Sequence, residues 1–170
     1  MQQPPKGEIA NSFNDGLALF SGGLLANPDP IVRSRGGRVD IYEELLRDDQ
    51  IGPCFEQRRR AVVQSEWDIE PGGTSAADQA AAEDAKEQIK RIDFDAVTDR
   101  MLHGLLYGYG VAEVLWGQDG QRVTLEAIKV RDRSRFRFDQ ERRLRLMQPG
   151  KPQGVILPER KFWTFSVGGH

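Results

Sequence analysis

The sequence is poor in the residues that build disulfide frameworks and metal sites. Its 170 residues include one cysteine and two histidines. A single cysteine, Cys54, excludes an internal disulfide framework and is typical of a reducing compartment. Together with His103 and His170 it leaves too few thiolate and imidazole groups for an ordinary zinc site, so only a carboxylate site remains open. We predict no cofactor and no resident metal.

Long apolar runs and a secretory leader are also missing. A helix that crosses a bilayer needs about 20 mostly apolar residues. The longest run here, Val111 to Trp116, is interrupted by Glu113. Residues 1–13 lack the charged start and the apolar stretch of a signal peptide. With 38% hydrophobic and 29% charged residues, the composition predicts a globular protein of the cytosol that does not contact a membrane.

The hydrophobic pattern changes along the chain from helical to extended. Residues 1–38 contain many Pro and Gly residues and no sustained period, which predicts a flexible N-terminal arm. Residues 39–109 are predicted to be mainly helical. Residues 110–170 alternate with a period of two between turn signals, which predicts antiparallel strands. The predicted fold class is therefore α+β, with N-terminal helices followed by an antiparallel β meander over residues 39–170.

Local signals place the helix starts and one early strand. Helices are expected to begin at Asp40, with Glu43 completing a capping box, near Pro53, after Ser75, and after Asp93. The last of these is predicted to continue as one helix from Phe94 to Tyr107, with a stripe of apolar residues on one side. Residues 65–70 alternate apolar and acidic side chains, which predicts a short half-buried strand.

Charge is unevenly distributed along a chain whose net charge is −2. Residues 120–161 carry 12 Lys and Arg against 5 Asp and Glu, a net charge of +7, and the remaining residues carry a net charge of −9. A chain divided in this way can attract polyanions, or it can attract a copy of itself. Both parts can equally be solvated surfaces of one folded domain.

The most informative part of the basic segment is its run of arginines at odd positions. If the segment is extended, alternate side chains lie on one side of the strand and the residues between them, such as Phe136 and Phe138, lie on the other. Guanidinium groups on one sheet face would bind carboxylates or phosphates in bidentate fashion. We predict contact with a neighbouring subunit ahead of solvent and ahead of nucleic acid. The candidate contact residues are Arg131, Arg133, Arg135, Arg137, Arg143 and Arg145.

Signals for catalysis are weak. The sequence contains no Walker-type phosphate loop and no G-x-S-x-G motif. His103 lies within a predicted helix and is interpreted as a structural or surface residue, and Cys54 as a small buried apolar residue. The three tryptophans are interpreted as core or interface anchors rather than as a platform for stacking bases. No enzymatic activity is predicted.

A series of short motifs in a fixed order resembles the N-terminal part of Mu-like phage portal proteins. The motifs are Asn27–Pro30, Tyr42–Leu45, Asp49–Ile51, Arg58–Val62, Trp67–Pro71, Leu105–Gly110, Glu113–Trp116, Arg135–Phe138 and Leu157–Phe162. They cover most of this chain but only part of a full portal. The resemblance predicts that the chain corresponds to the outer, wing-like body rather than to the helices that line the tunnel.

The resemblance implies a structural component of a virion, which would be in the host cytoplasm before assembly. Portals of this kind form a ring, usually of twelve subunits, that admits DNA during packaging and releases it at infection. The implied partners are further copies of the chain, the terminase motor, the capsid and head proteins, and the DNA that passes through the ring. The alternative function is a nucleic-acid-binding module that uses the arginine face directly.

Overall fold

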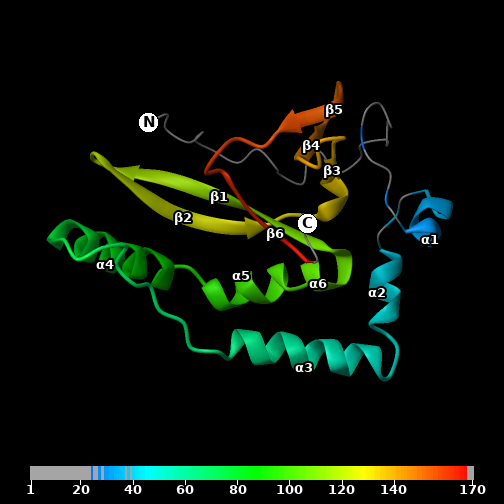
Figure 1. The fold of residues 1–170 in the computed structure, drawn as a ribbon, viewed down its shortest axis with the longest axis horizontal. Coiled ribbons are helices and arrows are strands. Elements are labelled where there is room, and N and C mark those ends of the chain that lie inside the picture. Colours follow the sequence, from blue (N-terminus) through cyan, green and yellow to red (C-terminus); the bar gives the residue numbers. More distant parts are fainter. Residues whose placement is uncertain (1–23, 25–26, 28, 37, 39, 168–170) are drawn as a thin grey trace.

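The computed structural model describes residues 24, 27, 29–36, 38 and 40–167, and its elements follow the predicted order (Figure 1). Helices precede strands, so the α+β class is confirmed. The helices are α1 (Pro30–Ser34), α2 (Ile41–Leu45), α3 (Ile51–Val63), α4 (Ala76–Lys90), α5 (Phe94–Met101) and α6 (Gly104–Tyr107). The strands are β1 (Tyr109–Asp119), β2 (Arg122–Val130), β3 (Phe136–Phe138), β4 (Leu144–Gln148), β5 (Lys151–Ile156) and β6 (Phe162–Ser166). The predicted arm at residues 1–38 lies mostly outside the described residues, and α1 is an element within it that the sequence did not predict.

The strands form two small antiparallel sheets. One has the order β2-β1-β6 and the other the order β3-β4-β5, which is the predicted meander. The β1–β2 hairpin turns at Gly120, whose φ of +59° is in the left-handed region that favours glycine. The last strand, β6, returns to pair with β1, so β1 is the central strand of its sheet and connects the two ends of the β region.

The core lies where the two sheets meet. Val111 of β1, Phe136 of β3 and Leu146 of β4 are fully buried and in contact with one another. Phe162 of β6 packs edge-on against Phe136, with the ring centroids 5.9 Å apart. Burial of apolar surface at this point holds β3, β4 and β5 against β1, because apolar area removed from water is the main favourable term in folding.

Two helix starts confirm the predicted caps and one does not. Ser75 forms a capping box with Asp78 at the start of α4, and the side chain of Asp93 accepts a hydrogen bond from the backbone of Ala96 at the start of α5. Asp40 precedes α2 but forms no cap, because its carboxylate pairs with the guanidinium group of Arg38. The predicted capping box with Glu43 is therefore wrong.

The single helix predicted from Phe94 to Tyr107 is broken in two. α5 ends at Met101, and the chain restarts as the short α6 at Gly104. A Cβ atom on Gly104 would lie 2.6 Å from the Phe165 ring and 2.8 Å from the backbone nitrogen of Gly110. The absence of a side chain at Gly104 therefore lets α6 approach β1 closely, and this packing overrides the helical period of the sequence.

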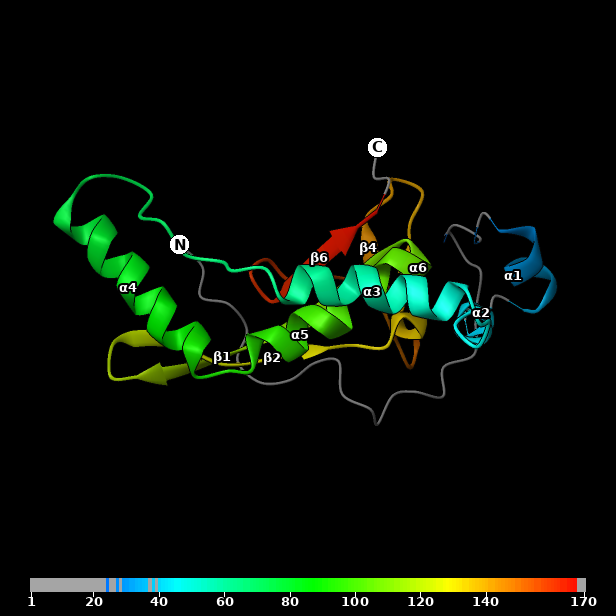
Figure 2. The same cartoon turned by 90° about the horizontal axis from the view of Figure 1, so that it is seen from below.

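Helix α3 lies beside α5, on the side of the molecule away from β5 (Figures 1 and 2). The half-buried side chain of Arg59 joins the two helices. Its guanidinium group donates to Glu56 at 2.7 and 2.9 Å, forms an ion pair with Asp99 at 2.9 Å, and contacts the His103 ring nitrogen Nε2 at 2.9 Å. Arg58, the neighbouring residue, is exposed.

Arg59 offers a direct test of how α3 is held. Substitution Arg59→Ala should lower the free energy of unfolding by about 2 kcal/mol, because hydrogen bonds to charged partners are lost at a half-buried site. The matched control is Arg58→Ala on the outer side of the same helix, for which a change below about 0.5 kcal/mol is expected. Urea unfolding followed by circular dichroism measures both. Equal effects at the two positions would contradict this account of Arg59.

The strand predicted at residues 65–70 is wrong. The chain leaves α3 at Val63 and runs to α4 without pairing with any strand in the described part of the chain. Trp67 is 46% exposed, although its ring contacts Phe94 at a centroid distance of 5.2 Å. The alternation of apolar and acidic residues is present in the sequence, but none of the described strands lies alongside to complete a ladder.

Candidate subunit-contact surface

The six candidate arginines do not share one sheet face. Residues Arg133–Arg135 form a turn of 3₁₀ helix, and β3 begins only at Phe136. The side chain of Asp132 caps this turn by accepting a hydrogen bond from the backbone of Ser134 at 2.7 Å. The extended conformation predicted for the whole arginine run is therefore wrong before Phe136. Asp132 lies two residues before Ser134, and at this spacing its side chain stabilises a local turn rather than a strand.

The predicted alternation does hold in β3 and β4. Arg137 lies opposite Arg145, whereas Phe136 lies opposite Leu146. Phe136 and Leu146 are fully buried, and both arginine side chains remain partly accessible. This short ladder has a basic side and an apolar side, as the period of two requires.

Arg131 is part of a buried ion-pair group rather than of a surface. Its guanidinium Nε and Nη2 donate to Oε2 of Glu113 at 3.0 and 2.9 Å. The ammonium group of Lys161 lies 3.6 Å from the other carboxylate oxygen. Glu113 and Lys161 have no exposed surface, and the Arg131 side chain is 12% exposed. These buried ion pairs link Glu113 of β1 to the residue that follows β2 and to the residue that precedes β6.

Arg133 and Arg135 are likewise turned into the protein. The Arg133 guanidinium lies over the Tyr107 ring, 3.1 Å from its centroid, in a cation–π contact. Tyr107 in turn donates its hydroxyl proton to Glu43 at 2.6 Å, and burial together with this bond raises the pKa of Tyr107 above its ordinary value. Arg135 is only 4% exposed. The 3₁₀ turn thus joins the sheets to α6 and α2.

Arg143 and Arg145 converge on one carboxylate. Asp139 accepts hydrogen bonds from the Arg143 backbone N–H at 2.8 Å, from Arg143 Nε at 3.0 Å and from Arg145 Nε at 2.8 Å. Burial raises the pKa of the Asp139 carboxyl, but these hydrogen bonds and the charge of Arg143 outweigh burial, so the pKa is about 2. The Arg143 side chain is 53% exposed and the Arg145 side chain 19%, so Arg143 is the more exposed member of this group.

The lowered pKa of Asp139 makes part of the stability depend on pH. The unfolded carboxyl titrates near 3.8 and the folded one near 2, so its contribution is present above about pH 4 and is lost as the pH falls towards 2. Asp139→Asn should lower the melting temperature at pH 7. The difference from the unsubstituted chain should shrink between pH 4 and pH 2 in thermal unfolding curves. Asp49→Asn, at an exposed carboxylate, serves as the control at pH 7. A difference that stayed constant down to pH 2 would contradict the prediction.

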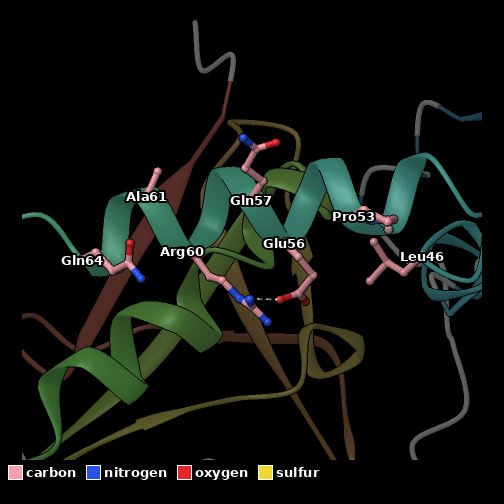
Figure 3. Close-up of a pocket in the computed structure, with 8 residues that line it drawn as sticks. Leu46, Pro53, Glu56, Gln57, Arg60, Ala61 and Gln64 are labelled. Atoms are coloured by element: carbon pink, nitrogen blue, oxygen red, sulfur yellow. Dashed lines mark ion pairs between the residues drawn. The ribbon is translucent and has the colours of Figure 1, made fainter.

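An open groove of about 750 Å³ runs along α3, as Figure 3 shows. Its ion pair joins Glu56 and Arg60 at 3.7 Å, and most of the other lining groups are apolar or amide. No group of three or more His, Cys, Asp or Glu side chains that could hold a metal ion occurs in the part of the chain that the structure describes.

Four single residues complete the comparison with the sequence. His103 contacts Arg59 and Phe55, which supports its interpretation as structural. Cys54 of α3 is exposed, so its prediction as a buried residue is wrong. Trp163 of β6 stacks on Phe94 at a centroid distance of 5.9 Å. Trp116 of β1 donates its ring N–H to the Arg160 carbonyl at 2.6 Å. These last two contacts are structural anchors, as the sequence predicted.

The chain has an α+β fold in which several of the candidate arginines contact groups of the same chain. A comparison with protein families identifies its class as phage portal proteins. The matching family model is described as the portal protein of Mu bacteriophage and covers residues 39–170. The chain therefore belongs to this family, as the order of its motifs suggested. No curated protein matches the chain.

Membership of this family has direct consequences. The family is structural rather than enzymatic, and it implies a ring assembly that associates with a phage capsid. It also indicates that the protein is a virion component. A search of the described helices finds none that is long and apolar enough to cross a membrane.

Proposed function

We propose that this chain forms part of the ring through which phage DNA is packaged and later ejected. The observation that carries the proposal is the family match over residues 39–170. In this function the helical and β regions form the wing-like body of a portal subunit, and copies of the chain assemble around a central channel, usually twelve to a ring. The terminase motor and the head proteins are the proposed partners, and the assembly is proposed to take place in the host cytoplasm.

The distribution of charge supports assembly with other copies. Residues 120–161 carry a net charge of +7 and the remainder −9. A ring uses heterologous interfaces, in which two different patches of each subunit meet, so opposite charges on the two patches favour the correct register. Among the six arginines, Arg143 is the one we propose to face a neighbour, because its side chain is 53% exposed.

Direct binding of nucleic acid is not favoured as the function. A surface that binds nucleic acid needs guanidinium groups exposed to solvent, because its affinity depends on how many phosphates these groups neutralise. Arg131 is committed to Glu113, Arg133 to the Tyr107 ring, and Arg135 is buried. Any DNA contact is therefore proposed for the channel of the assembled ring.

Electron microscopy of the purified protein tests the proposal. Closed rings with a central hole are expected, and Arg143→Glu should reduce the fraction of protein in rings. The control is Arg47→Glu, at an exposed position on the loop after α2. Two results together would reject the portal function in favour of nucleic-acid binding. The protein would stay monomeric at every concentration, and its affinity for DNA would rise steeply as the salt concentration falls.

A further inference from the structure

The segment between α3 and α4 has a strand-like sequence but pairs with none of the strands that the structure describes. Residues 66–71 belong to no helix or strand, and in the described part of the chain no backbone-to-backbone hydrogen bond involves residues 66–74. Figures 1 and 2 show the segment running out lengthwise from the end of α3. Its exposed side chains are acidic at Glu66, Asp68 and Glu70 and aromatic at Trp67. Asp68 is paired with Lys86, so Glu66 and Glu70 carry the outward charge.

The second sheet offers an edge with complementary properties. β5 is the outer strand of the order β3-β4-β5, and no strand in the described residues pairs with its other side. Ile156 near its end is 58% exposed, and Lys151 at its start is exposed and basic. Pro152 is consistent with an edge, where a missing N–H breaks no ladder. The edge therefore offers backbone groups, one apolar side chain and positive charge.

We propose that residues 66–70 of one copy pair as an added strand with β5 of a second copy. This inference rests on the proposed function, since it supplies a contact for the ring. An extended segment that joins a sheet edge gains backbone hydrogen bonds for affinity and side-chain contacts for specificity. Glu70 placed against Lys151 provides charge complementarity, to which Glu66 adds at longer range, and Trp67 and Ile156 provide apolar area.

The two edges cannot meet within one molecule. Figure 1 places β5 on one side of the β1–β2 ribbon and the segment that leads into α4 on the other. Pairing between them therefore requires a second copy, and each copy then has one acidic edge and one basic edge to offer. Such a head-to-tail contact is heterologous, and it forms a ring when the rotation between neighbours closes.

Disulfide trapping between two singly substituted proteins tests the contact. Both proteins carry Cys54→Ser, because Cys54 is exposed. One also carries Glu70→Cys and the other Lys151→Cys, and the two carry tags of different mass. After mixing and mild oxidation, the mixed dimer should exceed either homodimer by about tenfold, because paired edges hold the thiols at a high effective concentration.

The matched control replaces Glu70→Cys with Glu83→Cys, an exposed acidic position on α4 with a 74% exposed side chain. Mixed dimers no more abundant with Glu70→Cys than with Glu83→Cys would overturn the inference. If electron microscopy of the same sample shows rings, the proposed function stands without this contact. Abundant mixed dimers without rings would support the contact and count against ring closure.

Charge exchange provides a second, independent readout. Glu66→Lys with Glu70→Lys should weaken self-association by about tenfold in sedimentation experiments, and Lys151→Glu should weaken it by several-fold. Combining all three substitutions should restore most of the loss, since the charges are exchanged rather than removed. If the losses of association free energy from the separate substitutions simply add in the triple variant, these two edges do not meet.

Discussion

Replacing Glu113 with leucine is expected to lower the free energy of unfolding by about 3 to 5 kcal/mol. Glu113 and Lys161 are fully buried, and Arg131 is bound to the same carboxylate. Removing the carboxylate leaves two cations near each other in a region of low dielectric, where the attraction that offset their desolvation is lost. Urea unfolding at neutral pH, followed by tryptophan fluorescence, measures the loss.

Two further variants separate charge from shape. Glu113→Gln retains the size of the side chain but removes its charge, so most of the loss should remain. Adding both Lys161→Met and Arg131→Met to Glu113→Leu should recover stability, because well-packed apolar groups often replace a complete buried ion-pair group without cost. If Glu113→Gln were as stable as the unsubstituted chain, the charge of Glu113 would have no structural role.

Phe136→Ala is the substitution with the second large expected effect, a loss of about 3 to 5 kcal/mol. Phe136 is fully buried between Val111 and Leu146, and its ring contacts Phe162 of the other sheet. A cavity at this position removes the contact that joins the two sheets. Thermal unfolding by calorimetry measures the loss, and hydrogen exchange should show that β3 and β4 lose protection first.

The control for this cavity is Val123→Ala, a truncation in β2 at a side chain that is 43% exposed. A change below about 1 kcal/mol is expected there. Phe136→Leu should fall between the two, since it keeps part of the buried volume. Protection lost equally across both sheets in Phe136→Ala would mean that the sheets unfold as one unit and that Phe136 does not define their junction.

The sequence determined those features that depend on neighbouring residues. The caps at Ser75 and Asp93, the turn at Gly120 and the alternation of Phe136, Arg137 and Phe138 are all present in the structure. Each follows from contacts within a few residues or from the period of the backbone. The α+β class was predictable for the same reason, because it depends on the order of such local patterns.

The candidate contact residues were only partly predictable. The sequence identified the arginine run, but it did not show that Asp132 turns the chain into a 3₁₀ helix before Phe136. Nor did it reveal the destinations of the side chains, since the partners of Arg131 and Arg133 are Glu113 and Tyr107, far away in the sequence. Glu113 was visible in the sequence as part of a family motif and as an interruption of an apolar run, and neither is a strong signal of a buried ion pair.

The sequence by itself thus determined the local conformations, the fold class and the family to which the chain belongs. Only the tertiary structure decided which charges are buried, where α5 breaks before Gly104, and that residues 66–71 pair with no strand among residues 40–167. The physical reason is the separation along the chain between the residues that interact. Caps, turns and periodicity are properties of adjacent residues, whereas burial, ion pairing and strand pairing depend on which distant segments lie side by side.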